Sequence, residues 1–291
     1  GDQEDGCANQ LTMARASNGS PGDGEGHLVS TPWGSLFVRE HGPARSPPVL
    51  LLHALGTDMS IWDLLVTRLA GARHVIRIDA PGHGRSPVWV PGTLSLESLA
   101  RAHWSVLDQL VPGRVDLLGT SMGAVVALQV ADMAPHRVGR LVLCGAQLQR
   151  VNASADEMRQ RSMTISQSGM GQMVDTMVER WFPPRRDGDD HVIKEHLRSQ
   201  MLQTTPVGYI ACSKAMAHYD LSAALRRLQD RTLLIAGAMD GEIPRQFADL
   251  HLQFGESQYV CMADTGHFPH LQRPVEFHDL VDSFIDRGRP D

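Results

Sequence analysis

The pentapeptide GTSMG at residues 119–123 places Ser121 between two glycines, a spacing typical of a serine nucleophile on a sharp turn between a strand and a helix. The flanking sequence fits this context, because the strand-like run RVDLL precedes the turn and the helical segment AVVALQVADM follows it. The turn would expose the hydroxyl, and glycine allows the close backbone approach that such a turn requires. We therefore expect Ser121 to act as a nucleophile.

Asp240 and His267 are the candidate partners of Ser121. A serine hydroxyl is a weak nucleophile at neutral pH, so a base must take its proton and a third group must orient that base. Asp240 follows the strand-like run TLLIAG, and His267 follows QYVCM. We expect acyl transfer through an acyl-enzyme on Ser121, with His267 as general base and acid and Asp240 as the group that orients it.

Both assignments have alternatives. Asp240 could cap the helix that follows it, and His267 could be a loop histidine without a catalytic role. The other position for an acid, after the run LVLCG, holds Ala146 and Gln147. Asp264 is therefore the remaining, more distant rival of Asp240.

The negative charge that develops on a tetrahedral intermediate needs hydrogen-bond donors aimed at it. The backbone N–H groups of Met122, next to the nucleophile, and of Leu55, in the loop HALG after the strand-like run VLLL, are the candidates. His53 and His83 lie near these loops in the sequence, and we expect structural roles for both.

Strand-like and helix-like segments alternate on both sides of the turn. A hairpin pattern begins at His27, and short apolar runs such as HVIRID then alternate with longer amphipathic segments. This alternation predicts crossover connections and a mostly parallel sheet. It stops after LVLCG, where a Met-rich, helical block begins that could roof the site. The predicted parts are a disordered tail at 1–26, a core domain at 27–147 and 223–291, and a helical cap at 148–222.

The composition excludes several classes of function. The chain has 291 residues, of which 42% are hydrophobic and 21% charged, enough for one large core. A net charge of −6 leaves no basic field that could hold a nucleic acid. No segment reaches the roughly 18 apolar residues of a transmembrane helix. We expect neither a nucleic-acid nor a membrane partner, and the sequence leaves open whether the chain forms a homo-oligomer.

Neither the cysteines nor the histidines indicate a metal site. The four cysteines show no CxxC spacing and are interpreted as free thiols of a cytoplasmic protein. Among the 14 histidines there is no HExxH motif, and the pair His191 and His196 is spaced one residue too far apart for the inverted zincin pattern. We expect no metal, no cofactor and a cytoplasmic location.

Together these motifs resemble the α/β-hydrolase superfamily. The resemblance covers residues 27–287, and the segments PGHGRS at 81–86 and GTSMG are specific to that superfamily. It implies an α/β-hydrolase fold, in which a mostly parallel eight-stranded sheet is flanked by helices and carries a helical cap insertion. It also implies an enzyme that hydrolyses carboxylic esters or lactones.

Within the superfamily the chain looks most like the 3-oxoadipate enol-lactone hydrolases. The matching segments extend into the predicted cap, and they are LGTD at 55–58, WD at 62–63, GM at 169–170, RWF at 180–182 and GY at 208–209. This resemblance implies a small enol-lactone or related ester from aromatic catabolism as substrate. The chain departs from it at Met158, where those lactonases tend to carry tryptophan, and at Glu242, which adds a carboxylate near the site.

Three cap residues are candidate substrate contacts: Arg161, Trp181 and Tyr209. Arg161 falls where the lactonase resemblance has an arginine, and a guanidinium would pair with a substrate carboxylate in a partly dry site. An exposed position on a solvated helix is the alternative for Arg161, and an apolar core position is the alternative for the two aromatic residues. Four other arginines compete for the same role, and they are Arg159, Arg180, Arg185 and Arg186.

The residue type at position 121 separates related chemistries. Haloalkane dehalogenases and epoxide hydrolases need a carboxylate nucleophile, so Ser121 excludes both. General carboxylesterases, carbon–carbon bond hydrolases and cofactor-free haloperoxidases remain compatible with the residues. A receptor-like member of the fold, which binds a ligand with little turnover, is the alternative from another class, and the complete triad argues against it.

Overall fold

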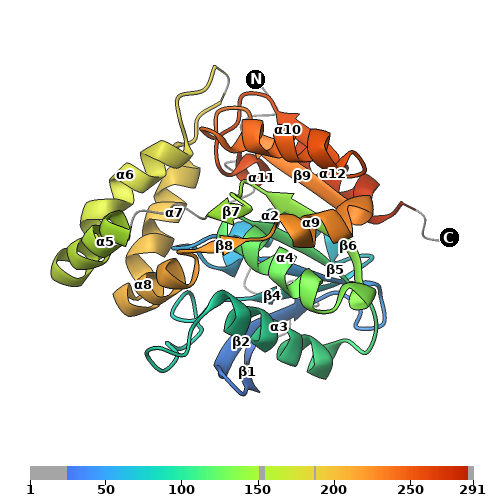
Figure 1. The fold of residues 1–291 in the computed structure, drawn as a ribbon, viewed down its shortest axis with the longest axis horizontal. Helices are drawn as coiled ribbons and strands as arrows, with labels where there is room; N and C mark the ends of the chain where they lie inside the picture. The colour runs from blue at the N-terminus through green and yellow to red at the C-terminus, as the bar shows by residue number, and fades with distance from the viewer. Residues whose placement is uncertain (1–24, 151–154, 187, 288–291) are drawn as a thin grey trace.

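The computed structural model describes residues 25–150, 155–186 and 188–287. Most of the tail predicted at 1–26 lies outside the described residues, as do the side chains of residues 155–158 and of Arg161. Figure 1 shows a twisted sheet with helices on both faces and a group of four helices set to one side of it.

Eight strands form one sheet, as the sequence predicted. Their order is β1-β2-β4-β3-β5-β6-β9-β10. The predicted hairpin is present as the antiparallel pair β1 and β2, β2 pairs antiparallel with β4, and the remaining pairs are parallel. The strands span His27–Thr31 (β1), Gly34–His41 (β2), Pro48–Leu52 (β3), His74–Ile78 (β4), Val115–Thr120 (β5), Val138–Cys144 (β6), Thr232–Gly237 (β9) and Gln258–Met262 (β10).

Helices cover both faces of the sheet because its strands carry apolar side chains on both faces. Along β3, Leu50 and Leu52 pack with α3 and α4, whereas Val49 and Leu51 pack with α2 and α12. The helices of this part span Asp63–Leu69 (α2), Leu96–Leu110 (α3), Met122–Met133 (α4), Ser222–Leu228 (α9), Ile243–Phe254 (α10), Pro269–Gln272 (α11) and Pro274–Ile285 (α12), and the short 3-10 helices span Met59–Trp62 (η1), Pro135–Arg137 (η2) and Gln229–Arg231 (η3).

The four helices at the side of the sheet are α5 to α8, and they span Ala155–Ser168 (α5), Gly171–Trp181 (α6), His191–Gln203 (α7) and Pro206–Ala215 (α8). They lie between β7 (Gln149–Arg150) and β8 (Tyr219–Asp220), which pair antiparallel. The segment therefore leaves and rejoins the rest of the chain at one short ribbon. The sequence did not predict this ribbon, because two-residue strands carry no periodic signal.

Two classes of feature are absent from the described part of the chain. None of its helices is both long and apolar enough to cross a lipid bilayer. Within the same residues, no group of three or more His, Cys, Asp or Glu side chains could hold a metal ion.

Candidate active site

Ser121 occupies a strained turn between β5 and α4. Its backbone angles are φ 54° and ψ −118°, which a residue with a Cβ rarely adopts. The turn is held by a 2.8 Å hydrogen bond from the Ser121 N–H to the carbonyl of Cys144 at the end of β6. Both flanking glycines are required by close approach: a Cβ on Gly119 would lie 2.2 Å from the Gly123 carbonyl oxygen, and one on Gly123 would lie 2.2 Å from that of Leu52.

The structure brings Asp240 and His267 together at the carboxyl ends of β9 and β10. These strands are parallel neighbours, so the loops that follow them meet at the same edge of the sheet. The Nδ1 atom of His267 lies 2.8 Å from Oδ2 of Asp240, and both side chains are nearly buried, with exposed fractions of 13% and 14%. A proton on Nδ1 would be donated to the carboxylate and would leave Nε2 as the acceptor that a general base needs.

The alternatives for Asp240 do not fit the geometry. Glu242, rather than Asp240, is the N-cap residue of α10, and no side-chain capping bond forms there. The carboxylate of Asp264 accepts hydrogen bonds from the Arg186 N–H at 3.1 Å and from the Arg273 guanidinium at 3.3 Å. The Asp264 carboxylate is therefore engaged with other partners, while the Asp240 carboxylate contacts the histidine.

Gly145 joins the turn to the Asp240–His267 pair, and sequence reasoning missed it. It follows Cys144 with φ 57°, and a Cβ at this position would lie 3.1 Å from the His267 carbonyl oxygen and 3.4 Å from Oδ2 of Asp240. The end of β6 therefore contacts Ser121 through Cys144 and the Asp240–His267 pair through Gly145. A glycine directly after a buried strand was the signal in the sequence.

Trp181, at the end of α6, backs the His267 ring. The two rings stack with centroids 6.0 Å apart and an interplanar angle of 12°, and the Trp181 ring meets Phe268 edge-on at 5.1 Å. The Trp181 carbonyl also accepts the His267 N–H at 2.9 Å. Trp181, which the sequence predicted as a site residue, thus contacts the candidate base His267 directly from the end of α6.

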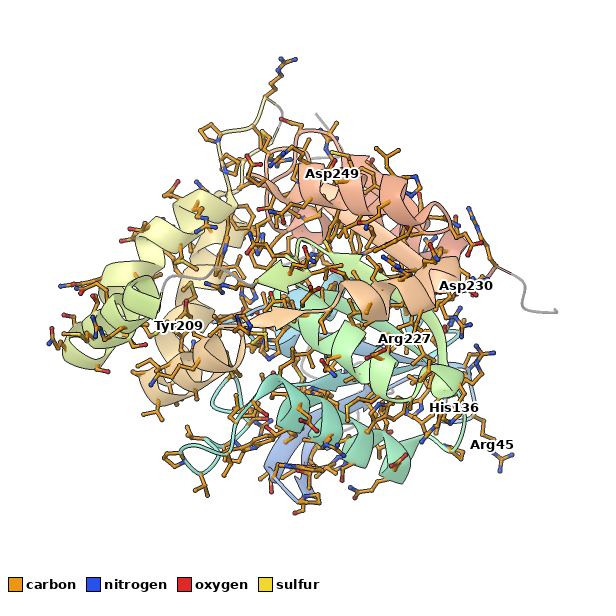
Figure 2. All side chains as sticks on the ribbon, viewed as in Figure 1. Arg45, His136, Tyr209, Arg227, Asp230 and Asp249 are labelled. Atoms are coloured by element: carbon orange, nitrogen blue, oxygen red, sulfur yellow. The ribbon has the colours of Figure 1, made fainter. Side chains whose placement is uncertain are left out.

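Tyr209 lies on α8 (Figure 2) and is fully buried. A Cβ on Gly56 would lie 3.2 Å from the Tyr209 ring and 3.5 Å from Met201. Tyr209 is part of the apolar core where the helical segment meets the loop after β3, which fits the core interpretation. It supports that loop rather than lining an open surface.

The loop after β3 carries Leu55 and is fixed by His53. The His53 Nδ1 lies 2.8 Å from the Ala54 carbonyl oxygen, and its Nε2 accepts the Ala80 N–H at 2.8 Å. His53 therefore has the structural role that the sequence suggested. Among the described residues, the backbone N–H groups of Leu55 and Met122 donate no hydrogen bond, so both remain free for a ligand.

The arginines predicted as possible substrate anchors differ in exposure and in whether they already pair with a carboxylate. The Arg161 side chain lies outside the described part of the chain, although its backbone belongs to α5. Arg180 and Arg186 are exposed. Arg185 forms two hydrogen bonds with Asp190, at 2.8 and 3.1 Å, and is therefore already paired with a carboxylate of the chain. It is a poor candidate for a substrate anchor.

Three buried histidines make the stability of the fold sensitive to acid. Burial lowers the pKa of His83 and of His270 to about 3 and that of His103 to about 4. The unfolded chain binds these protons near pH 6.5, so the unfolded state holds more protons below that pH and stability falls as the pH falls. We expect each histidine to cost about 1.4 kcal/mol of unfolding free energy per pH unit between pH ~6.5 and the folded-state pKa.

Urea unfolding at pH 7 and pH 5 measures this effect. His103→Gln should reduce the pH dependence by the contribution of one histidine, because glutamine does not titrate. An unfolding free energy that is equal at the two pH values would contradict the assignment of these histidines as buried and neutral.

Residues 49–280 match the model of a family described as the alpha/beta hydrolase family. A 3-oxoadipate enol-lactonase of Acinetobacter baylyi is 26% identical over 256 residues, which cover 87% of this chain and 94% of that protein. A pimeloyl-[acyl-carrier protein] methyl ester esterase of Methylococcus capsulatus is 30% identical over 264 residues, which cover 86% and 98%.

A solved structure resembles the whole described fold. The crystal structure of the enol-lactonase from Burkholderia xenovorans LB400 superposes with a TM-score of 0.81 at 25% sequence identity. The match covers 89% of this chain and 99% of that one.

Proposed function

Because the chain belongs to the alpha/beta hydrolase family, we propose that it is a serine hydrolase that cleaves carboxylic esters or lactones through an acyl-enzyme on Ser121. The observation that carries this proposal is the hydrogen bond between Asp240 and His267, formed at the sheet edge where the strained turn holds Ser121. A receptor-like role would not require an oriented base. The oriented Asp240–His267 pair therefore favours catalysis over ligand binding alone.

The reaction follows from the positions of these groups. His267 Nε2 takes the proton of the Ser121 hydroxyl while the hydroxyl oxygen attacks the substrate carbonyl carbon. The free N–H groups of Leu55 and Met122 stabilise the oxyanion that forms. Collapse of the intermediate breaks the ester bond, and the leaving oxygen receives the proton from His267. Water then attacks the acyl-enzyme by the same steps, with His267 again as base, and releases the acid.

A fluorophosphonate probe tests the mechanism. It phosphonylates an activated serine, so mass spectrometry should place the adduct on the peptide that contains Ser121. Labelling should be much slower in His267→Ala, because the hydroxyl then lacks its base. A hydrolytically active protein that remains unlabelled would rule out the acyl-enzyme.

The relatives support two narrower classes of substrate, an enol-lactone and a simple carboxylic ester. The similarity to a 3-oxoadipate enol-lactonase extends over most of both chains. The sequence resemblance to that family also reaches into the helical block, at 169–170 and 180–182. We therefore favour a small carboxylated enol-lactone of aromatic catabolism. The similarity to a methyl ester esterase supports the alternative, a general carboxylesterase. Both classes share the same ester bond chemistry at Ser121.

The helical block is assigned as a cap that selects the substrate. Two contacts support this proposal: Trp181 at the end of α6 stacks on His267, and Tyr209 on α8 lies beside Gly56 in the loop that carries Leu55. Arg161 remains the proposed carboxylate anchor because it falls where the lactonase resemblance has an arginine, and the pairing of Arg185 with Asp190 removes one of its rivals. A planar guanidinium can bind a carboxylate through two hydrogen bonds.

A substrate panel separates these possibilities. We expect 3-oxoadipate enol-lactone to be hydrolysed faster than aryl esters, acyl lactones or a dicarboxylate methyl ester. Arg161→Ala should raise KM for the carboxylated lactone about 10- to 100-fold while sparing a neutral ester. Rates confined to simple esters would favour the carboxylesterase, and equal losses on both substrates in Arg161→Ala would indicate a packing role.

A further inference from the structure

A buried ion pair lies behind the His267 loop, outside the triad. The Arg185 guanidinium donates two hydrogen bonds to the Asp190 carboxylate, and each side chain is only 7% exposed. A Cβ on Gly188 would lie 2.2 Å from Nη2 of Arg185, so a glycine is needed for the chain to pass over the guanidinium. A buried carboxylate needs such a partner, because an isolated charge is costly to bury.

Gln272 connects this pair to the catalytic loop. Its Nε2 donates to Oδ2 of Asp190 at 2.7 Å, and its Oε1 accepts the Gly266 N–H at 2.6 Å. Gln272 is the last residue of α11 and is 7% exposed. The carboxylate can only accept and the N–H can only donate, so the amide has a single orientation that satisfies both ends.

Two successive N–H groups of the catalytic loop are thereby fixed. The Gly266 N–H is held by Gln272, and the His267 N–H is held by the Trp181 carbonyl at 2.9 Å. Gly266 has no freedom to shift toward the cap, because a Cβ there would already lie 2.2 Å from the Trp181 oxygen. Trp181 thus fixes the backbone of His267 directly, and Asp190 fixes that of Gly266 through Gln272.

We infer that Asp190 and Gln272 are positioning residues, which hold His267 in the orientation that Asp240 and Ser121 require. This inference rests on the proposed role of His267 as the base. Asp190 orients the Gln272 amide, Gln272 fixes the Gly266 N–H, and the neighbouring imidazole stays aligned with Asp240. Misplacing a catalytic group by about 1 Å can cost about 100-fold in rate, so these hydrogen bonds act on turnover rather than on substrate binding.

Gln272→Met tests this inference, because methionine keeps the length of the side chain and removes both hydrogen bonds. We expect kcat to fall about 10- to 100-fold with KM changed by less than about twofold. The proton NMR signal of His267 Nδ1–H, identified by its absence from His267→Ala, should shift or broaden. Thr232→Val is the matched control, since it removes one buried hydrogen bond, from Thr232 to Leu228, at the opposite end of β9.

The two readouts separate this inference from the proposed function. If the signal changes in Gln272→Met but not in Thr232→Val while the wild-type protein shows no hydrolase activity, the positioning role stands and the proposed function fails. An unchanged signal in folded Gln272→Met overturns the positioning role, whether or not kcat falls. Equal changes in Thr232→Val overturn it as well, because a general loss of stability would then explain them.

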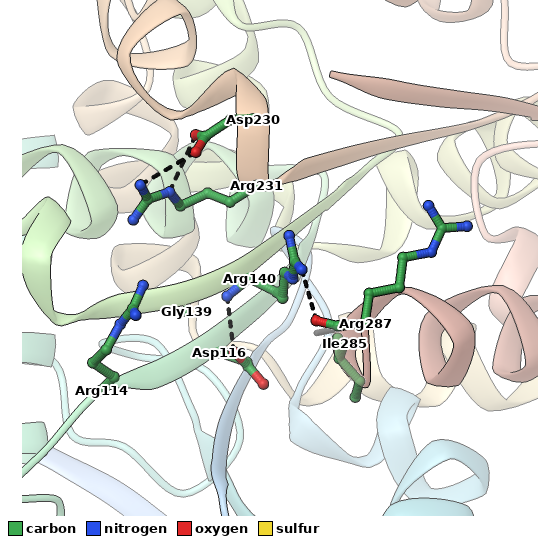
Figure 3. Close-up of a pocket in the computed structure, with 8 residues that line it drawn as sticks. All are labelled: Arg114, Asp116, Gly139, Arg140, Asp230, Arg231, Ile285 and Arg287. Carbon is green, nitrogen blue, oxygen red and sulfur yellow. Dashed lines mark hydrogen bonds and ion pairs between the residues drawn. The ribbon is translucent and has the colours of Figure 1, made fainter. Parts of the chain in front are cut away.

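A second feature lies at the opposite edge of the sheet, where β5, β6 and β9 begin. A pocket of about 380 Å³ is lined there by four arginines and two aspartates. Arg114 precedes β5, Arg140 lies on β6, Arg231 precedes β9 and Arg287 follows α12, so four separate segments supply the positive charges (Figure 3).

The four arginines outnumber the two aspartates that line the pocket. The Asp116 Oδ2 accepts from Arg73 at 2.8 Å and both side chains are buried, although the Arg73 guanidinium also pairs with the Asp286 carboxylate. The Asp116 Oδ1 accepts the backbone N–H of Arg140 at 2.8 Å. Asp230 pairs with its neighbour Arg231 at 3.2 Å and is more than half exposed, where an ion pair contributes little.

Backbone carbonyls hold two of the guanidinium groups without neutralising them. Arg114 donates to the Val138 carbonyl at 2.8 Å, and Arg140 donates to the Arg287 carbonyl at 2.7 Å. These two guanidinium groups are thus anchored while their charge is retained, and a guanidinium can bind an oxyanion through paired hydrogen bonds. The geometry points to a binding site for a small dianion of the phosphate monoester type, remote from Ser121.

Isothermal titration calorimetry at constant ionic strength tests this site with inorganic phosphate, glycerol phosphate and pyrophosphate. If only inorganic phosphate binds, the ligand of the site is the free phosphate ion. If glycerol phosphate binds more tightly, the ligand is a phosphate ester. The double variant Arg114→Gln and Arg287→Gln should weaken binding at least about tenfold. The matched control Arg101→Gln removes an exposed arginine paired with Glu97 and should bind as the wild type does. No heat at about 10 mM anion, or equal weakening in the control, overturns the site.

Discussion

Ser121→Ala is expected to lower kcat/KM about 10⁴- to 10⁶-fold for any ester or lactone that the enzyme hydrolyses. The proposed mechanism needs the Ser121 hydroxyl, and the backbone of its strained turn is held by the Cys144 carbonyl and by the close packing of Gly119 and Gly123. Alanine keeps that backbone but removes the attacking oxygen. Steady-state rates with purified protein, corrected for spontaneous hydrolysis, measure the loss.

Non-additivity gives the stronger test of this prediction. If Ser121 and His267 act as one unit, the double variant Ser121→Ala/His267→Ala should be about as slow as either single variant, because each removes the same covalent route. The residual rate would come from the oxyanion donors of Leu55 and Met122 and from substrate binding. Losses that multiply in the double variant would show that the two residues act independently.

The elements around Ser121 could be predicted because their signals are local. Buried parallel strands consist of short apolar runs, and the runs RVDLL and LVLCG lie in β5 and β6, on either side of the predicted helix α4. The closing helix α12 spans Pro274–Ile285. Proline near the first helical position marks where such a helix begins, and its apolar face can be recognised from the sequence without distant contacts. The eight-stranded, mostly parallel sheet is therefore largely a product of local pattern.

Local sequence favoured Asp240 but left Asp264 as a distant rival. Asp240 follows the buried strand β9 and Asp264 follows the partly exposed strand β10, and each precedes a helix. The outcome depends on backbone conformation, since Asp264 adopts φ 54° and directs its carboxylate to Arg186 and Arg273. A left-handed aspartate is not visible in residue types alone.

The contacts of the cap were beyond sequence reasoning for a different reason. Arg185 was one of several arginines that could bind a substrate, and its pairing with Asp190 depends on how the loop between α6 and α7 is folded. Asp190 and Gln272 are separated by 82 residues. Neither carries a motif, and the hydrogen bond between them exists only because α11 packs beside the cap. Long-range side-chain pairing of this kind has no periodic signal.

Asp240→Asn is expected to lower kcat about 10⁴-fold, a loss of the size found when a triad carboxylate becomes an amide. The Asp240 carboxylate accepts a hydrogen bond from Nδ1 of His267 at 2.8 Å, which fixes the tautomer with a free Nε2. An asparagine can donate its N–H to Nδ1 instead, so the imidazole proton moves to Nε2, where it blocks removal of the Ser121 proton.

Asp264→Asn is the matched control for this prediction, because it makes the same chemical change on the neighbouring loop. Its carboxylate accepts from the Arg186 N–H and from Arg273, neither of which touches the imidazole. An amide oxygen can still accept one of these hydrogen bonds, so kcat should stay within about threefold of the wild type. A large loss in Asp264→Asn together with a small loss in Asp240→Asn would show that Asp264 orients the histidine. The loop that carries Asp264 would then have to adopt a different conformation in solution. Equal and large losses would instead mean that His267 also depends on the conformation of its own loop, which Arg186 contacts at Asp264 and Trp181 contacts at His267.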